Sequence, residues 1–210
     1  DETLTEGRVR QLPDGTLFTA AGWARRAAHL ERQLADYHAT HPLRAGLPQE
    51  ELAQRLGLPQ RVALAFAGAL QADGRLQIGE GWLALPGWEV TLSAAQQRRV
   101  DALVAAFAAS PFSPPNPGEA LARLEGDEAL LSHLVARGDL IRLSPDVLLG
   151  RDAYDRMVAG VRALHAEGHD LSVATVRDHF DTSRKYAVAL LEYLDTQRIT
   201  RRIGDKRVLR

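Results

Sequence analysis

One short pattern recurs four times along this chain, and no other feature of the sequence limits the possible folds as strongly. Each copy reads as an apolar residue, a short spacer, a glycine or polar residue, and then alternating apolar positions. The four copies cover residues 4–18, 70–85, 134–149 and 194–209. Their equivalent positions, Gly7, Gly74, Gly138 and Gln197, lie 67, 64 and 59 residues apart. A period of roughly 60 residues is too long for a solenoid repeat and fits a small autonomous domain, so the sequence predicts an array of similar modules.

The residues before the second copy show what one module contains. In the stretch 22–37, apolar side chains recur at spacings of three and four, which predicts a long amphipathic helix. Two shorter helices are expected at 49–56, which ends at a glycine, and at 58–70. Residues 74–85 then alternate around the turn Gly79-Glu80-Gly81, which is typical of two strands joined by a tight turn. Three helices followed by a β-hairpin are the order of a winged helix, whose hairpin is called the wing.

The same order repeats toward the C-terminus, with Ser93 and Asp152 as expected caps of the first helices. The predicted fold class is therefore α+β, mainly α, built from tandem winged-helix domains. We expect a remnant of a first winged helix, its wing, at 1–20, and further winged helices at 21–90, 91–150 and 151–210. Because almost no flexible linker separates these segments, the sequence predicts fixed orientations in an elongated, bent array.

Bulk composition excludes several classes of protein. The 210 residues carry a formal net charge of −1, which argues against a generic polyanion binder. The chain contains no cysteine, so disulfides and thiolate metal sites are excluded. It has neither a signal-peptide pattern nor the roughly 20 apolar residues that cross a bilayer, so we expect a cytoplasmic protein without membrane contact. Because the sequence begins at Asp1 without methionine, we expect the C-terminal piece of a longer protein.

Positive charge is concentrated at the C-terminal end. Residues 151–210 hold 12 Arg and Lys against 9 Asp and Glu, whereas residues 1–150 hold 14 against 18. The predicted wings differ in the same direction, because 74–85 and 138–149 contain one cation each and 197–209 contains five. A wing that needed only polar outer residues would not differ so much between copies, so the last module is the expected contact for a polyanion.

No catalytic pattern accompanies this charge. The sequence lacks the phosphate-binding GxxxxGK[ST] loop, the dinucleotide-binding GxGxxG loop, the GxSxG nucleophile elbow and the HExxH metal motif. His165 and His169 have a helical spacing that zinc could use, but no third ligand pattern joins them, and a solvated pair is the better interpretation. We therefore expect a binding function and not an enzyme, with no metal site.

The candidate binding residues fall into two groups in the last module. The first group lies at the start of the predicted third helix, where free backbone N–H groups and the helix dipole also favour a phosphate. It consists of Ser183, Arg184, Lys185 and Tyr186. The second group lies on the wing and consists of Arg201, Arg202, Lys206 and Arg207. The winged-helix order predicts that both groups converge on one nucleic-acid backbone. The competing interpretation is that the cations are solvated and that Tyr186 or Tyr193, or both, belong to the core, which we favour for Tyr193.

Two segments resemble a known family. The stretch FDTSRKYAVALLEYLDTQRITRRIGDKRVL (180–209) resembles the final winged helix of the bacterial selenocysteine-specific translation elongation factors, the SelB family. The segment YHATHPLRAGLPQEELAQRLGL (37–58) resembles the second winged helix of the C-terminal extension of those factors.

This resemblance implies a role in selenocysteine incorporation. Such factors bind GTP and selenocysteinyl-tRNA through an N-terminal region that is absent from these 210 residues, so GTP and magnesium are expected only there and this segment is expected to hold no cofactor. Their winged helices grip an mRNA hairpin, the SECIS element, and hold the factor beside a recoded UGA codon. The implied RNA-binding residues are the two groups named above, which would contact loop phosphates and extruded bases. The expected partners are an mRNA stem-loop and, through the full-length factor, the ribosome, with the protein itself a monomer.

Two other functions use the same fold. A DNA-binding transcriptional regulator would bind a palindromic duplex as a dimer and place the helix 182–194 in a major groove, which Glu192 and Asp195 disfavour. A protein-interaction scaffold would use an exposed Trp82 or Trp88, although an aromatic residue beside a wing usually belongs to the core. A basic tip on otherwise acidic modules suits a compact RNA hairpin better than long duplex DNA, and the acidic modules are then expected to act as a spacer of fixed length.

Overall fold

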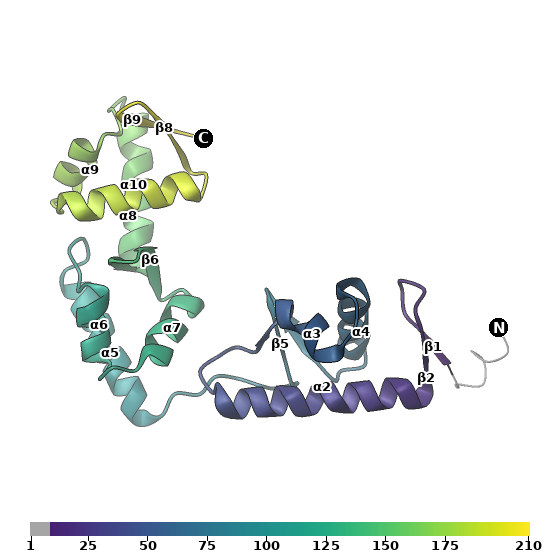
Figure 1. The fold of residues 1–210 in the computed structure, drawn as a ribbon. Helices are drawn as coiled ribbons and strands as arrows, with labels where there is room; N and C mark the ends of the chain where they lie inside the picture. Colours follow the sequence, from purple (N-terminus) through teal and green to yellow (C-terminus); the bar gives the residue numbers. More distant parts are fainter. Residues whose placement is uncertain (1–8) are drawn as a thin grey trace. The chain divides into compact units, whose positions relative to one another are not determined.

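A computed structural model describes residues 9–210, which divide into two compact units. The first unit ends at Thr91, and the second comprises Leu92–Arg210. Figure 1 shows the helices and strands of both units. Gly7 and the beginning of the first sequence repeat lie outside the described residues.

The first unit begins with a hairpin and continues with four helical segments. The hairpin pairs β1 (Val9–Gln11) with β2 (Leu17–Thr19), and the long helix α2 (Ala20–Thr40) follows directly. The helical segments after α2 are the 3-10 turn η1 (Gln49–Glu51), α3 (Leu52–Leu56) and α4 (Gln60–Ala72). The rings of Phe18, Trp23 and Phe66 meet with centroid distances of 4.4 to 6.0 Å. Because Phe18 belongs to β2, the hairpin shares the core of the helices that follow it.

A three-stranded sheet forms the wing of the first unit. Its strand order is β3 (Leu47–Pro48), β5 (Trp82–Ala84) and β4 (Gln77–Gly79), all antiparallel. The turn requires glycine twice, because Gly81 has φ +79° and a Cβ on Gly79 would lie 2.2 Å from the ring of Trp82. The ring of Trp82 therefore packs directly against the backbone of the wing at Gly79.

The second unit contains two successive sets of three helices and a hairpin. In the first set, α5 (Ala94–Ala109), α6 (Pro117–Arg123) and α7 (Glu128–Arg137) precede β6 (Leu140–Ser144) and β7 (Val147–Gly150). In the second set, α8 (Arg151–Ala166), α9 (Val173–Phe180) and α10 (Arg184–Thr196) precede β8 (Thr200–Ile203) and β9 (Lys206–Leu209). Both hairpins are antiparallel.

The two sets of the second unit share one apolar core. Ile141, Leu143, Val147 and Leu149 of the first wing pack in the same buried cluster as Met157 of α8 and further side chains of α9 and α10. At about 25 cal/mol per Å² of buried apolar surface, such a cluster resists separation of the two sets. The second unit is therefore a single packed body.

The structure confirms the fold class, and four antiparallel hairpins follow the four sequence repeats. Ser93 caps α5 as expected: its hydroxyl accepts a hydrogen bond from the backbone N–H of Gln96, and its own N–H donates to the Gln96 side chain. Asp152 does not cap α8, because the N-cap position is Gly150 and Asp152 lies in the first turn. Strand β3 was not expected, since two residues give no periodic signal. The four-module boundaries and the bent array stay predictions. None of the described helices combines the length and the apolar character that crossing a bilayer requires.

Candidate nucleic-acid interface

The start of α10 forms the first exposed part of the candidate site. Ser183 occupies the N-cap position with φ −78° and ψ 157°, and its side chain accepts no hydrogen bond from the helix. Ser183, Arg184 and Lys185 are all exposed, and the first turn contains no acidic residue. The unpaired N–H groups, the helix dipole and two cations therefore favour an anion at this position. We call these three residues the helix-start group.

Tyr186 does not belong to this exposed group. It is 9% exposed and lies in the apolar cluster of the second unit. Its hydroxyl donates a hydrogen bond to the carbonyl oxygen of Pro114 at 2.5 Å. Burial, and secondarily the charge of Glu119, raise the pKa of Tyr186. The expectation that Tyr186 contacts RNA is corrected by this geometry, because a buried ring offers no face on which a base can stack.

The wing cations lie on two different faces of the β8–β9 hairpin. The register pairs Arg201 with Val208 and Arg202 with Arg207. Since side chains alternate along a strand and paired residues share a face, Arg201 and Lys206 lie on one face, and Arg202 and Arg207 on the other. Four cations in this register cannot all face one ligand.

Arg207 is a structural residue. Its side chain is 5% exposed, and its Nε donates to the Oδ2 atom of Asp195 at 3.0 Å. The other oxygen of Asp195 accepts from the hydroxyl of the buried Thr200 at 2.6 Å. Asp195, one residue before the end of α10, therefore anchors both strands of the wing. The expectation that Arg207 contacts RNA is corrected, because its guanidinium is buried and already bound to Asp195. Breaking this pair to bind a ligand would leave a poorly solvated charge.

Three cations of the wing remain exposed, namely Arg201, Arg202 and Lys206, which we call the wing group. Lys206 forms an ion pair with Asp170, but both side chains are more than half exposed, so water and salt weaken it. The Nε of Arg202 donates to the carbonyl of Gly204 at 2.9 Å. Among the described residues, the side chain of Arg201 has neither a hydrogen bond nor an ion pair.

The helix-start group lies at the start of α10, whereas the wing is attached near the end of this helix. The wing is anchored to Asp195 near the end of this helix and to Leu171, whose carbonyl accepts from the backbone N–H of Arg207 at 3.1 Å. Leu171 precedes α9, whereas the helix-start group follows the end of α9. Figure 1 shows the β8–β9 hairpin leaving the end of α10 and passing above this helix. The two groups therefore belong to different elements, the first turn of α10 and the β8–β9 hairpin.

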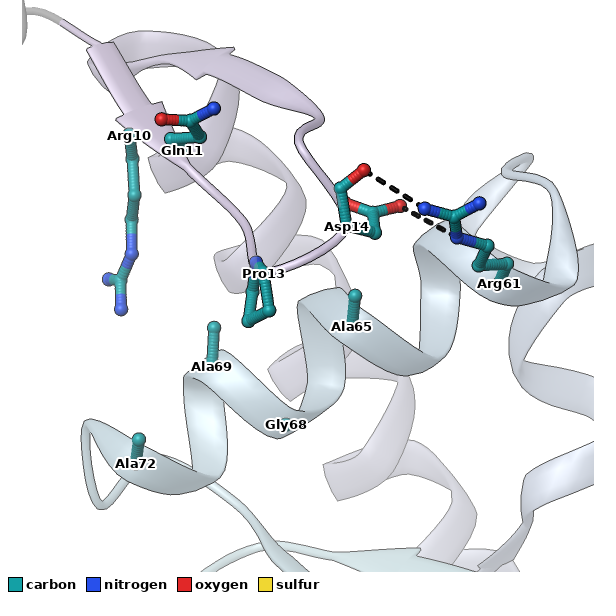
Figure 2. A pocket seen from close by; sticks show the side chains of 9 residues that line it. All are labelled: Arg10, Gln11, Pro13, Asp14, Arg61, Ala65, Gly68, Ala69 and Ala72. Atoms are coloured by element: carbon teal, nitrogen blue, oxygen red, sulfur yellow. Dashed lines mark hydrogen bonds and ion pairs between the residues drawn. The ribbon is translucent and has the colours of Figure 1, made fainter.

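In the first unit, α4 occupies the third-helix position that α10 occupies in the second. Its outer face carries Ala65, Gly68, Ala69 and Ala72, and the tip of the β1–β2 hairpin lies over this face (Figure 2). Arg61 of α4 donates to the carbonyl oxygen of Asp14 at 3.0 Å and lies 3.8 Å from its carboxylate. A shallow groove of about 630 Å³ remains between the hairpin and the helix.

The remaining sequence expectations concern aromatic side chains and metals. Trp88 stacks on the buried His38 at a centroid distance of 4.0 Å, and its indole N–H donates to the carbonyl of Arg44. Trp82 packs on Gly79 and is only partly exposed. Neither tryptophan presents a free ring, which removes the support for a scaffold function.

Within residues 9–210, no cluster of three or more His, Cys, Asp or Glu side chains is suited to a metal ion.

Sequence reasoning missed the residues that hold the start of α10. Thr182 is 8% exposed, and its hydroxyl donates to the carbonyl oxygen of Phe112, seventy residues earlier. The four prolines between positions 110 and 118 were a visible signal of a stiff loop, but nothing in the sequence indicated which helix the loop would contact.

Comparison with known proteins identifies both units. Residues 32–85 and 162–209 each match a family described as elongation factor SelB, winged helix. The selenocysteine-specific elongation factor of Desulfomicrobium baculatum is 29% identical over 184 residues, which are 84% of this chain and 29% of that protein. The chain thus spans less than a third of the length of this relative.

Two solved structures are also similar. The crystal structure of bacterial selenocysteine-specific elongation factor EF-Sec shares the fold over 97% of this chain and 32% of its own, with 16% identity and a TM-score of 0.51. The mRNA-binding domain of Escherichia coli SelB, solved in complex with SECIS RNA, is 24% identical over 57% of this chain and 99% of its own, with a TM-score of 0.47. The sequence matches show that both units carry winged helices of the elongation factor SelB family.

Proposed function

We propose that this chain binds an mRNA stem-loop, the SECIS element, through its last winged helix. Binding would bring a selenocysteine-specific elongation factor, with its GTP and selenocysteinyl-tRNA, to a recoded UGA codon on the ribosome. GTP and magnesium would be bound by a region of the factor outside these residues. We propose that the chain acts as a monomer, because one basic end suffices for one hairpin.

The observation that carries this proposal is the uncapped, cationic start of α10. Arg184 and Lys185 are exposed without a carboxylate partner among the described residues, and the Ser183 hydroxyl and the first-turn N–H groups are available beside them. These are the groups that bind nucleic-acid phosphates at helix starts. The SelB family match covers the same segment, residues 162–209.

The two separated basic groups favour a folded RNA over a DNA duplex read by an inserted helix. A stem-loop presents phosphates along its stem and unstacked bases in its loop, so one hairpin can contact both groups. A regulator that inserts α10 into a major groove would instead place Glu192 near phosphates, since this residue is exposed on the same helix. The family match also does not favour a transcriptional regulator.

The test is a binding titration at several salt concentrations. The chain is titrated against a labelled stem-loop RNA that it has enriched from a pool with a randomised loop, with duplex DNA as competitor. The double variant Arg201→Ala with Arg202→Ala is expected to bind more weakly and to reduce the salt dependence by about one to two phosphate contacts. The matched control is Arg142→Ala, which removes the exposed cation of the preceding wing and should leave the titration unchanged. Preference for duplex DNA, or equal salt slopes for all three proteins, would contradict the proposal.

A further inference from the structure

The loop of residues 110–116, which we call the proline loop, lies against the start of α10. Its Phe112 carbonyl accepts a hydrogen bond from the hydroxyl of Thr182, and its Pro114 carbonyl accepts one from the hydroxyl of Tyr186. Thr182 and Tyr186 are 8% and 9% exposed, and Pro114 is buried. The two hydroxyls lie four residues apart and bracket the helix-start group.

Aromatic contacts attach the same loop to two further helices. The ring of Phe112 meets Phe180 at the end of α9, with a centroid distance of 5.1 Å. The guanidinium of Arg156 on α8 lies 4.9 Å from the centre of the same Phe112 ring. The proline loop, which belongs to the preceding set of helices, is therefore held by α8, α9 and α10 together.

Helix α10, like α8 with its N-cap Gly150, lacks the side-chain cap that the other helices of the second unit have. Helices α5, α6, α7 and α9 are each capped by the side chain of the residue before them, respectively Ser93, Asn116, Asp127 and Ser172. Ser183 makes no such bond. A missing cap costs about 1 kcal/mol and leaves the first N–H groups without partners, so the first turn would fray unless another contact held it.

We propose that the proline loop is a positioning element for RNA recognition, which holds the helix-start group in its binding geometry while leaving the helix start uncapped. Thr182 and Tyr186 are then positioning residues, because they act through their contacts with the loop and do not touch the RNA. The inference rests on the proposed function of the last winged helix. It also gives the segment 91–150 a role beyond that of a spacer.

The chemistry of the loop suits this role. Proline fixes its own φ angle and restricts the residue before it, so the loop carbonyls of Phe112 and Pro114 are held in place at little entropic cost. A carbonyl acceptor on a stiff loop keeps a hydroxyl, and with it the helix turn, in one position. The N–H groups and the Ser183 hydroxyl of that turn then remain free for a phosphate, as an internal cap would not allow.

The test compares two tyrosines of α10. Tyr186→Phe removes the hydroxyl that binds Pro114, whereas Tyr193→Phe removes a hydroxyl from the half-buried tyrosine that packs edge-on against Tyr154. Amide hydrogen exchange is measured on the 210-residue chain without RNA, and affinity is measured with the enriched stem-loop RNA. Tyr186→Phe is expected to speed exchange at residues 184–187 and in the proline loop, and to weaken RNA binding by about fivefold, the equilibrium equivalent of one hydrogen bond. Tyr193→Phe is expected to change neither quantity.

Each outcome has a distinct meaning. Faster exchange with unchanged RNA affinity would show that the contact holds the helix but does not serve recognition, which would overturn the inference. Equal behaviour of both variants would overturn it as well. If the unsubstituted chain enriches no stem-loop, the proposed function itself fails, whatever the variants do. A second pair guards against unfolding, because Thr182→Val is expected to mimic Tyr186→Phe and Thr182→Ser, which keeps the hydroxyl, is expected to restore normal binding.

Discussion

Helices α4 and α10 hold the same position in two winged helices, but their surroundings differ. The outer face of α4 consists of small residues and lies beneath the β1–β2 hairpin, with Arg61 bound to Asp14 of that hairpin. At α10, the proline loop accepts hydrogen bonds from Thr182 and Tyr186 and leaves the cations between them exposed. The hairpin covers the outer face of α4, whereas the proline loop supports the start of α10 and leaves its cations exposed.

The pairing of cations differs between the two helices in the same way. Arg10, which lies beside the groove at α4, forms two hydrogen bonds with Asp73, and Arg75 binds Glu31. These partners raise the pKa of both arginines and offset part of their charge. Arg184 and Lys185 have no carboxylate partner among the described residues. The two copies of one fold therefore differ in which cations are already paired, and such surface differences allow one fold to serve different functions.

The largest expected effect concerns the covering of α4. Phe18→Ala removes the hairpin ring from its contacts with Trp23 and Phe66, and should lower the free energy of unfolding of the first unit by about 3 kcal/mol or more. Chemical denaturation measures this change. The affinity of the chain for the stem-loop RNA should stay the same, because the proposed interface lies in the second unit.

The control for this variant lies on the same strand. Leu17 is 59% exposed, so Leu17→Ala should change the unfolding free energy by no more than about 0.5 kcal/mol. A loss of RNA affinity in Phe18→Ala would show that the first unit also contributes to recognition, and the contrast between the two helices would then be wrong.

Charge reversal compares the two helices directly. Arg184→Glu combined with Lys185→Glu should weaken stem-loop binding about a hundredfold, because each lost charge-assisted contact is worth roughly a factor of ten. The matched change on α4, Arg61→Glu, should leave the RNA affinity as it is. Titration of the three proteins at one salt concentration gives the answer, and equal losses from both helices would mean that the chain binds RNA by its overall charge.

Much of the fold could be predicted from the sequence, because the relevant signals are local. Helical spacing of apolar residues located α2 and the later helices, and alternation around Gly79 and Gly81 located the wing. The cap at Ser93 was predicted correctly, since capping depends on the next three residues. Strand β3 was missed because its two residues pair with β5, more than thirty positions later.

The candidate site could be predicted only in part, for the same physical reason. The sequence located the cluster of cations around Arg184 and Arg201 but not which of them were already paired. Arg207 is buried because Asp195, twelve residues earlier, accepts its hydrogen bond. Tyr186 is buried because a loop seventy-two residues earlier supplies the acceptor. Pairing across such distances depends on tertiary packing, which residue spacing does not encode.

A smaller effect should appear with pH in the first unit. His38 is 4% exposed, its Nε2 atom has no hydrogen-bond partner, and burial lowers its pKa below the ordinary 6.5. The folded chain therefore binds this proton less readily than the unfolded chain. Stability contributed by neutral His38 is complete above pH 6.5 and should decrease as the pH falls from there toward the lowered folded value.

Thermal unfolding between about pH 7.5 and 5 tests this dependence, in a range set by the ordinary histidine pKa. His38→Gln should flatten the decline in the melting temperature of the first unit. His29→Gln, a change of an exposed histidine on the same helix, should leave the decline as it is. If all three proteins lose stability in parallel, His38 does not cause the pH dependence of the melting temperature. The dependence then comes from the carboxylates of the first unit.

The smallest expected effect concerns the ion pair that closes the groove beside α4. Arg10 lowers the pKa of Asp73 through two hydrogen bonds, but both side chains are about one third exposed, so the pair should contribute only about 0.5 kcal/mol. Asp73→Asn should therefore destabilise the first unit slightly in dilute buffer, and the difference should vanish near 1 M salt, where screening acts within a few ångströms. Glu80→Gln, a change of an exposed carboxylate on the wing turn, is the control and should have no effect at either salt concentration. A loss that persists at high salt would mean that Asp73 holds the hairpin by hydrogen-bond geometry, and the covering of α4 would then depend on this contact as well as on Phe18.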